Sequence, residues 1–267
     1  MGLRDETNKQ QQQQQQRALE EVIEKLSPPS STRHIHIEGY FGSRLPNWMM
    51  VPATWVFKSL RILRMDKLHY CTQLPNGLCQ LPSLETLSIN DARAIKTVGP
   101  KAWRNGTGRS KGRVRLQPAL RVLHIDNCKL RYLPPGLSSS KRFGLRQLNL
   151  YELSNLTSVE NFPSVVEVDI FDCPKLTRIS SLSKLQKIRI VRCPIVVLLE
   201  GVPLLDSMVM EDTTMETLPE YLTTVTPRYL KLTCSKKLYE PLLTCSSSEY
   251  DKISHIKSRT IDYIRSR

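Results

Sequence analysis

His124 and Asp126 stand two residues apart, a spacing that places an imidazole and a carboxylate on the same side of an extended strand. A neighbouring carboxylate tunes the pKa of a histidine, so this pair is a candidate for acid–base chemistry. His34 and His36, which flank Ile35, raise the same question. Neither pair comes with a nucleophile, an oxyanion donor or a predicted enclosing pocket. We therefore interpret both pairs as solvated side chains and predict that the protein is not an enzyme.

Three of the seven cysteines end a shared nine-residue pattern, in 120-LRVLHIDNC-128, 165-VVEVDIFDC-173 and 185-LQKIRIVRC-193. Metal-binding cysteines typically occur as close pairs such as C-x2-C, and the sequence contains no such pair. We predict structural thiols that satisfy backbone groups in a bend. No metal and no cofactor are expected.

The stretch 99-GPKAWRNGTGRSKGRVR-115 contains six basic residues and no acidic one. Its glycines and charges predict an exposed loop that could contact the phosphates of a nucleic acid or another polyanion. Only Trp103 could stack on a base, no groove-reading element is visible, and no phosphate-binding Gly-Lys-Ser/Thr sequence is present. Nucleic-acid or polyanion binding through this loop and the basic tail after Tyr250 is therefore the alternative function, not the leading one. The basic residues are Lys101, Arg104, Arg109, Lys111, Arg113 and Arg115.

The elements that must position these residues follow from the nine-residue pattern, which has apolar residues at places 1, 4 and 6. Copies begin at residues 60, 84, 120, 145, 165, 185 and 205, with weaker copies at 32 and 227. Successive copies are 28, 24, 36, 25, 20, 20, 20 and 22 residues apart. Self-similarity at 20–29 residues is typical of leucine-rich repeats. The one long interval contains the basic stretch, which we interpret as an insertion.

Places 4 and 6 point the same way from a short strand, and one turn cannot bury that apolar row alone. We therefore predict an α/β leucine-rich-repeat solenoid (horseshoe), with a short-stranded parallel sheet on the concave face and an irregular convex side. The predicted domain covers residues 18–249, has about nine repeats and contains the insertion loop 99–115. Residues 1–17 are rich in glutamine and are predicted to form a disordered linker. Residues 250–267 are predicted to form a basic C-terminal cap or tail, for which helix and strand fit equally.

Places 5 and 7 should point outward on the concave face, which solenoids use for partners. Tyr151 and Phe171 should lie on adjacent strands in one column, and exposed neighbouring aromatic residues suit a protein contact. The candidate partner-binding residues of this face are His36, Arg64, Asp66, His124, Asp126, Tyr151, Asp169, Phe171, Arg189 and Glu211.

Three phrases carry a resemblance to a known family: 31-STRHIHIEGYFGSRLPNWM-49, 70-YCTQLPNGLCQLPSLETLSI-89 and 172-DCPKLTRI-179. The chain resembles the leucine-rich-repeat region of plant intracellular nucleotide-binding leucine-rich-repeat disease-resistance proteins of the coiled-coil class. The nucleotide-binding module of that family is not found in this sequence. The resemblance implies a protein-recognition module in plant innate immunity. Its partner would be a pathogen effector, a guarded host protein or the receptor's own switch module.

Charge and hydropathy indicate which cellular compartment and which partners to expect. The formal net charge is +14, and an acidic protein partner would complement it. No apolar stretch is long enough to span a bilayer, and the N-terminus lacks the apolar core of a signal peptide. We expect a cytoplasmic protein, with the nucleus as the alternative, and no membrane partner. An extracellular repeat receptor would have an export signal and paired cysteines, so we disfavour that class.

Overall fold

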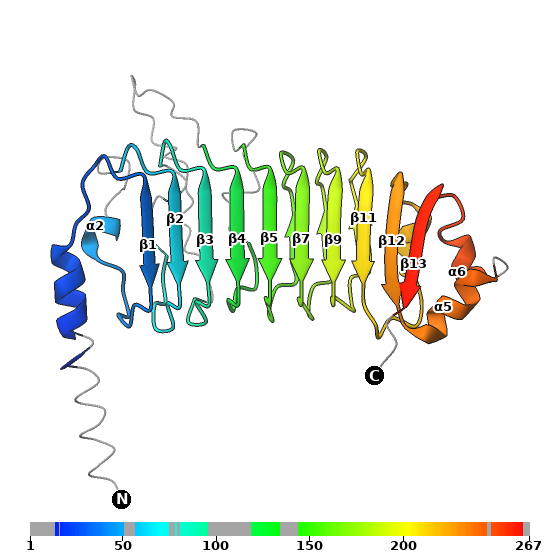
Figure 1. Ribbon diagram of the computed structural model, residues 1–267, viewed down its shortest axis with the longest axis horizontal. Coiled ribbons are helices and arrows are strands. Elements are labelled where there is room, and N and C mark those ends of the chain that lie inside the picture. The colour runs from blue at the N-terminus through cyan, green and yellow to red at the C-terminus, as the bar shows by residue number, and fades with distance from the viewer. Residues whose placement is uncertain are drawn as a thin grey trace, which may run out of the picture.

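The computed structural model describes residues 14, 15, 17–50, 57–74, 78, 81–95, 119–133, 144–244 and 247–263. Its main sheet is parallel, and its strand order follows the chain (Figure 1). The strands are β1 (His34–Glu38), β2 (Ile62–Asp66), β3 (Thr86–Asn90), β4 (Val122–Asp126), β5 (Gln147–Tyr151), β7 (Glu167–Phe171), β9 (Lys187–Val191), β11 (Ser207–Glu211), β12 (Tyr229–Cys234) and β13 (Ser258–Tyr263). The predicted leucine-rich-repeat solenoid is therefore confirmed.

Places 4 and 6 of every repeat point to one side of the main sheet. Leu123, Leu148 and Val168 are partners in register on β4, β5 and β7, and each is at most 1% exposed. Because strands in a parallel sheet lie about 4.8 Å apart, equivalent side chains stack into continuous columns. These columns form one hydrophobic core, and burial of each such side chain contributes about 1.5–3 kcal/mol.

The chain leaves each of the first seven strands of the main sheet through a residue at place 8 with a left-handed backbone. Glu152 has φ of 52°, and its N–H donates to the carbonyl of Phe171 at 2.8 Å. The same φ sign and the same bond to the next repeat recur in seven consecutive repeats, at Gly39, Lys67, Asp91, Asn127, Glu152, Asp172 and Arg192. Six of these residues are not glycine, and each of the six accepts backbone strain while its N–H forms an inter-repeat hydrogen bond.

The cysteines at place 9 are buried beneath the sheet, as the sequence predicted. The Cys193 thiol donates to the carbonyl of Val191 at 3.3 Å and accepts the N–H of Cys173 at 3.4 Å. Cys128 donates in the same way to the carbonyl of Asp126. Burial raises the pKa of the Cys128 thiol to about 12, so the S–H donor is retained at neutral pH. These thiols satisfy backbone groups in the bend, which is the structural role we expected.

In three turns the side of the solenoid opposite the main sheet is also regular. Strands β6 (Ser158–Glu160), β8 (Arg178–Ser180) and β10 (Leu198–Glu200) form a second parallel sheet. Val159, Ile179 and Leu199 are in register and fully buried. This sheet occurs where the repeats are 20 residues apart, because equal turn lengths keep both sides of the turn in register.

Both described ends of the sheet are covered. Residues 17–25 form a helix whose Ile23 carbonyl accepts the indole N–H of Trp48, from helix α2 (Asn47–Met50). Residues 14 and 15 are helical too, so helix begins within the predicted linker; residues 1–13 and 16 lie outside the described residues. At the other end, helices α5 (Lys236–Leu243) and α6 (Ser248–Asp251) precede β13, and Ile253 and Ile256 are buried. The segment predicted as a cap or tail thus supplies the last strand, and the sheet continues past residue 249.

Candidate functional site

The candidate site is the open face, defined here as the surface formed by places 5, 7 and 8 of the main-sheet repeats. Along β5 the even places are buried and the odd places are partly exposed, and the other central strands alternate in the same way. The structure places all ten predicted partner-binding residues on this face. Three other positions expected to point outward are buried: Ser88, Val191 and Thr233. Val191 lies in register between Phe171 and Glu211, whose side chains are larger.

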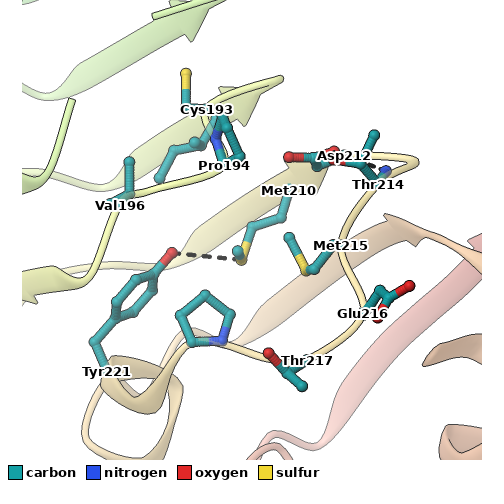
Figure 2. A pocket seen from close by; sticks show the side chains of 12 residues that line it. Cys193, Pro194, Val196, Met210, Asp212, Thr214, Met215, Glu216, Thr217 and Tyr221 are labelled. Atoms are coloured by element: carbon teal, nitrogen blue, oxygen red, sulfur yellow. Dashed lines mark hydrogen bonds between the residues drawn. The ribbon is translucent and has the colours of Figure 1, made fainter. Parts of the chain in front are cut away.

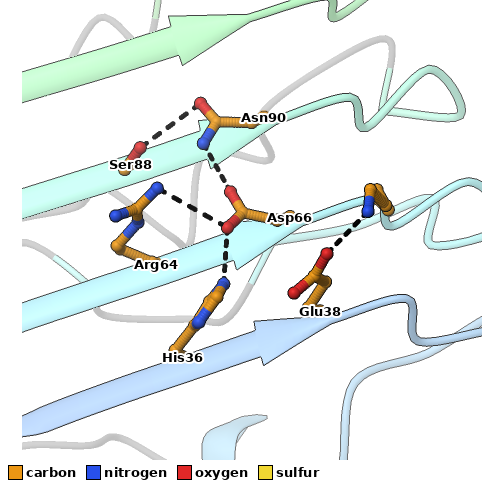
Figure 3. A network of polar contacts seen from close by, with 7 residues as sticks. His36, Glu38, Arg64, Asp66, Ser88 and Asn90 are labelled. Atoms are coloured by element: carbon orange, nitrogen blue, oxygen red, sulfur yellow. Dashed lines mark hydrogen bonds and ion pairs between the residues drawn. The ribbon is translucent and has the colours of Figure 1, made fainter.

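A polar cluster surrounds Asp66 at the N-terminal end of the open face (Figure 3). His36 contacts Oδ2 of Asp66 at 2.5 Å, and Asn90 Nδ2 donates to Oδ1. Arg64 Nη2 lies 3.8 Å from the same carboxylate. The Asp66 carboxylate therefore bonds to side chains of both neighbouring strands, and the cluster connects β1, β2 and β3.

An aromatic cluster lies at the centre of the open face, on β4, β5 and β7. The Tyr151 ring packs edge-on against His124 at 5.0 Å between centroids and against Phe171 at 6.2 Å. The Tyr151 hydroxyl donates to Asp169 Oδ2 at 2.8 Å. Burial raises the pKa of this hydroxyl to about 12, and the bond to Asp169 acts in the same direction. The predicted neighbours Tyr151 and Phe171 are thus in contact, and the hydrogen bond to Asp169 orients the Tyr151 ring.

Charged side chains continue the cluster toward β11. Arg189 lies between two carboxylates, with Nη1 3.9 Å from Asp169 Oδ2 and Nη2 3.8 Å from Glu211 Oε2. Asp169 Oδ1 is buried and has no hydrogen-bond partner within the described part of the chain. The distances around Arg189 are long for ion pairs, so these groups retain the capacity to bond to a partner.

Arg192 was missed by the sequence reasoning, because it occupies place 8 and only places 5 and 7 were considered. Its guanidinium lies over the Phe171 ring, 4.1 Å from the centroid. Its Nη2 also pairs with Asp172 Oδ2 at 2.8 Å. The signal that could have found it is the repeat itself, since place 8 of one turn lies close to place 7 of the turn before it, at the same edge of the sheet.

His124 and Asp126 shift each other's pKa without forming a hydrogen bond or ion pair in the described structure. Burial lowers the pKa of His124, while the Asp126 charge opposes this shift and the Arg64 charge reinforces it. Burial raises the pKa of Asp126, opposed by His124. Both side chains are half-buried on the open face of the sheet.

We expect His124 to titrate below its ordinary pKa of 6.5 in a 1H–13C NMR titration. As the pH falls, His124 is protonated in the unfolded chain before it is protonated in the folded chain. The free energy of unfolding therefore falls as the pH drops from 6.5 toward the folded-state pKa. Asp126→Asn should lower the His124 pKa further, because it removes the attractive charge. A midpoint at or above 6.5 in the wild type would contradict the dominance of burial.

A small pocket lies beside the last regular turn, near the 3-10 helix η3 (Glu220–Thr223) (Figure 2). Met210 and Met215 line it, and the Tyr221 hydroxyl points toward Met210 Sδ at 3.9 Å. The Asp212 carboxylate at its rim already accepts from the backbone N–H and the hydroxyl of Thr214. Glu216, the other acidic residue of the lining, pairs with Lys237 Nζ at 2.7 Å, so both carboxylates have partners and we assign the pocket no chemical role.

The six basic residues of loop 99–115 lie outside the described residues. No group of three or more His, Cys, Asp or Glu side chains that could hold a metal ion occurs in the described ranges. Within the same ranges, no helix is both long and apolar enough to cross a bilayer.

The fold and the open face define a leucine-rich-repeat protein with an aromatic and charged sheet surface. Residues 3–92 match the family model described as R13L1/DRL21 leucine-rich repeats. The chain is 29% identical over 157 residues to putative disease resistance RPP13-like protein 1 of Arabidopsis thaliana, covering 59% of this chain and 13% of that protein. It is 24% identical over 231 residues to putative disease resistance protein RGA1 of Solanum bulbocastanum, covering 82% of this chain and 20% of that protein.

The resemblance to the repeat region of plant disease-resistance proteins is therefore confirmed, and the chain corresponds to a fifth or less of the length of these relatives. Among solved structures, the leucine-rich-repeat domain of the type III effector XopL aligns with a TM-score of 0.47 and 17% identity, over 87% of this chain and 69% of that domain.

Proposed function

We propose that this chain is a protein-recognition module in plant innate immunity and that it binds its partner through the open face. The partner would be a pathogen effector, a guarded host protein or the receptor's own switch module, and the chain itself would have no catalytic role. The observation that carries the proposal is the cluster of His124, Tyr151 and Phe171. Partly exposed aromatic side chains in mutual contact are typical of the energetic centre of a protein interface.

The charges of the open face support a protein partner over a polyanion. Carboxylates recur at places 7 and 8, where the strands end, and include Glu38, Asp66, Asp91, Asp126, Glu152, Asp172 and Glu211. Several of these carboxylates pair with Lys67, Arg189 or Arg192, and repulsion from the others disfavours phosphates on this surface. Polyanion binding would then depend on loop 99–115 and the basic C-terminal tail. A gel shift with random duplex at physiological salt tests that alternative.

The proposal predicts that Tyr151→Ala with Phe171→Ala weakens partner binding by at least about tenfold, as loss of hot-spot residues does. Affinity would be measured by biolayer interferometry against candidate effectors, host proteins and a nucleotide-binding module from a relative. Lys175→Ala is the matched control, because this exposed lysine lies outside the open face and bonds only to Asn155 among the described residues. Circular dichroism would establish that each variant is folded. Unchanged affinity in the double variant would remove the open face as the binding surface.

A further inference from the structure

One edge of the open face contains a filled cation site made by the protein itself. Phe171 at place 7 and Asp172 at place 8 receive Arg192 from place 8 of the next turn. The guanidinium lies 4.1 Å from the ring centroid and 2.8 Å from the carboxylate. An aromatic ring and an adjacent carboxylate thus hold an arginine by a cation–π contact and an ion pair.

The turn before it repeats the ring and the carboxylate without the cation. Tyr151 and Glu152 occupy places 7 and 8, and Tyr151 is in register with Phe171. Their backbones match as well, since Glu152 and Asp172 have φ of 52° and 54°. The residue that corresponds to Arg192 is Asp172, an acid. The position that holds the cation in one turn therefore has no cation in the other.

The surroundings of the Tyr151 ring and Glu152 also favour a positive charge, while the one nearby guanidinium, Arg189, lies beside Asp169 at the hydroxyl end of Tyr151. The Glu152 side chain is exposed and forms no hydrogen bond or ion pair with any described residue. Among the described side chains, no arginine or lysine lies over the Tyr151 ring. Asp126 is in register with Tyr151 on the other side and has no ion pair within the described chain, so it adds negative charge. His124, whose pKa is lowered by burial, contributes little opposing charge at neutral pH.

We propose that Tyr151 and Glu152, assisted by Asp126, bind an arginine side chain presented by the protein partner. This inference rests on the proposed function and deepens it, because it names the chemistry of the bound residue. Arginine is assigned over lysine because a planar guanidinium stacks on an aromatic ring while its fork of N–H donors pairs with a carboxylate. The filled copy one turn away uses arginine in this way.

The experiment uses the acetylated, amidated peptide Gly-Arg-Gly as the probe, titrated into the full chain at low salt and followed by NMR. We expect saturable shifts of the Tyr151 ring and Glu152 resonances. Glu152→Gln and Tyr151→Ala should each weaken binding by about fivefold, the size of a cation–π or single-charge contact. The same peptide with citrulline tests the charge, and the peptide with lysine tests the guanidinium. Absent shifts at Tyr151, or equal binding of either control peptide, would overturn the assignment.

A second titration uses the Arg192→Ala variant, because this substitution removes the bound guanidinium from the site formed by Phe171 and Asp172. The variant should show a second set of saturable shifts at Phe171, and Arg192→Ala with Asp172→Asn should lose that set. No second set in Arg192→Ala would overturn the inference that ring and carboxylate suffice. The probe needs no partner. If the peptide does not bind while Tyr151→Ala with Phe171→Ala still abolishes partner binding, the result contradicts the arginine site and supports the recognition function.

Discussion

Leu148→Ala should lower the free energy of unfolding by about 3–5 kcal/mol, measured by urea denaturation. Leu148 is 0% exposed and lies at the centre of the sheet, between Leu123 on β4 and Val168 on β7. Truncation leaves a cavity that both neighbouring turns share. In a solenoid each turn contacts only its neighbours, so the loss interrupts the core between the two halves of the sheet.

The matched control for Leu148→Ala is Asn149→Ala, one residue along the same strand. Its side chain faces the open side and accepts a 3.3 Å bond from Gln147, so we expect a cost below about 1 kcal/mol. Equal destabilisation by the two variants would contradict the division of the strand into a core face and an open face.

Glu152→Pro should lower the free energy of unfolding by about 3 kcal/mol or more. Proline cannot adopt the φ of 52° found at this position, and it removes the N–H that donates to the Phe171 carbonyl at 2.8 Å. The Glu152 side chain has no partner among the described residues, so the substitution isolates the backbone. The measurement is again urea denaturation, with circular dichroism at zero denaturant to establish the fold.

Glu152→Gly separates strain from the lost donor. Glycine accepts a left-handed backbone freely and keeps the N–H, so stability should stay unchanged or rise by up to about 1 kcal/mol. A loss of several kcal/mol in Glu152→Gly would show that the side chain, and not the bend, matters at place 8.

The strands and their register could be predicted from the apolar residues alone. Leu123, Leu148 and Val168 share place 4 in the sequence and pair in register in the structure. The second sheet was not predicted. Its strands are three residues long and span only three turns, so Val159, Ile179 and Leu199 give too short a pattern to separate from irregular chain. The left-handed bends also escaped prediction, because charged residues such as Lys67, Glu152 and Arg192 occupy them alongside glycine, asparagine and aspartate.

The candidate site was predicted in position but not in its contacts. Repeat spacing placed Tyr151 beside Phe171, and the structure confirms that the rings touch. The spacing could not show that the Tyr151 hydroxyl reaches Asp169, because that bond depends on side-chain rotation. Nor could it show that Val191 is covered, since alternation along one strand says nothing about the size of the flanking side chains.

The three equal turns between residues 145 and 205 have translational symmetry along the stack. The bonds Val166 N–Arg146 O, Gln186 N–Val166 O and Asp206 N–Gln186 O all measure 2.8 Å. A tandem duplication of residues 165–184 would therefore add a complete turn whose backbone donors and acceptors find the same partners above and below. Unequal crossing-over within such a gene can lengthen the sheet by one strand at a time without disturbing the other turns. The length of the open face can therefore evolve separately from the side chains that lie on it.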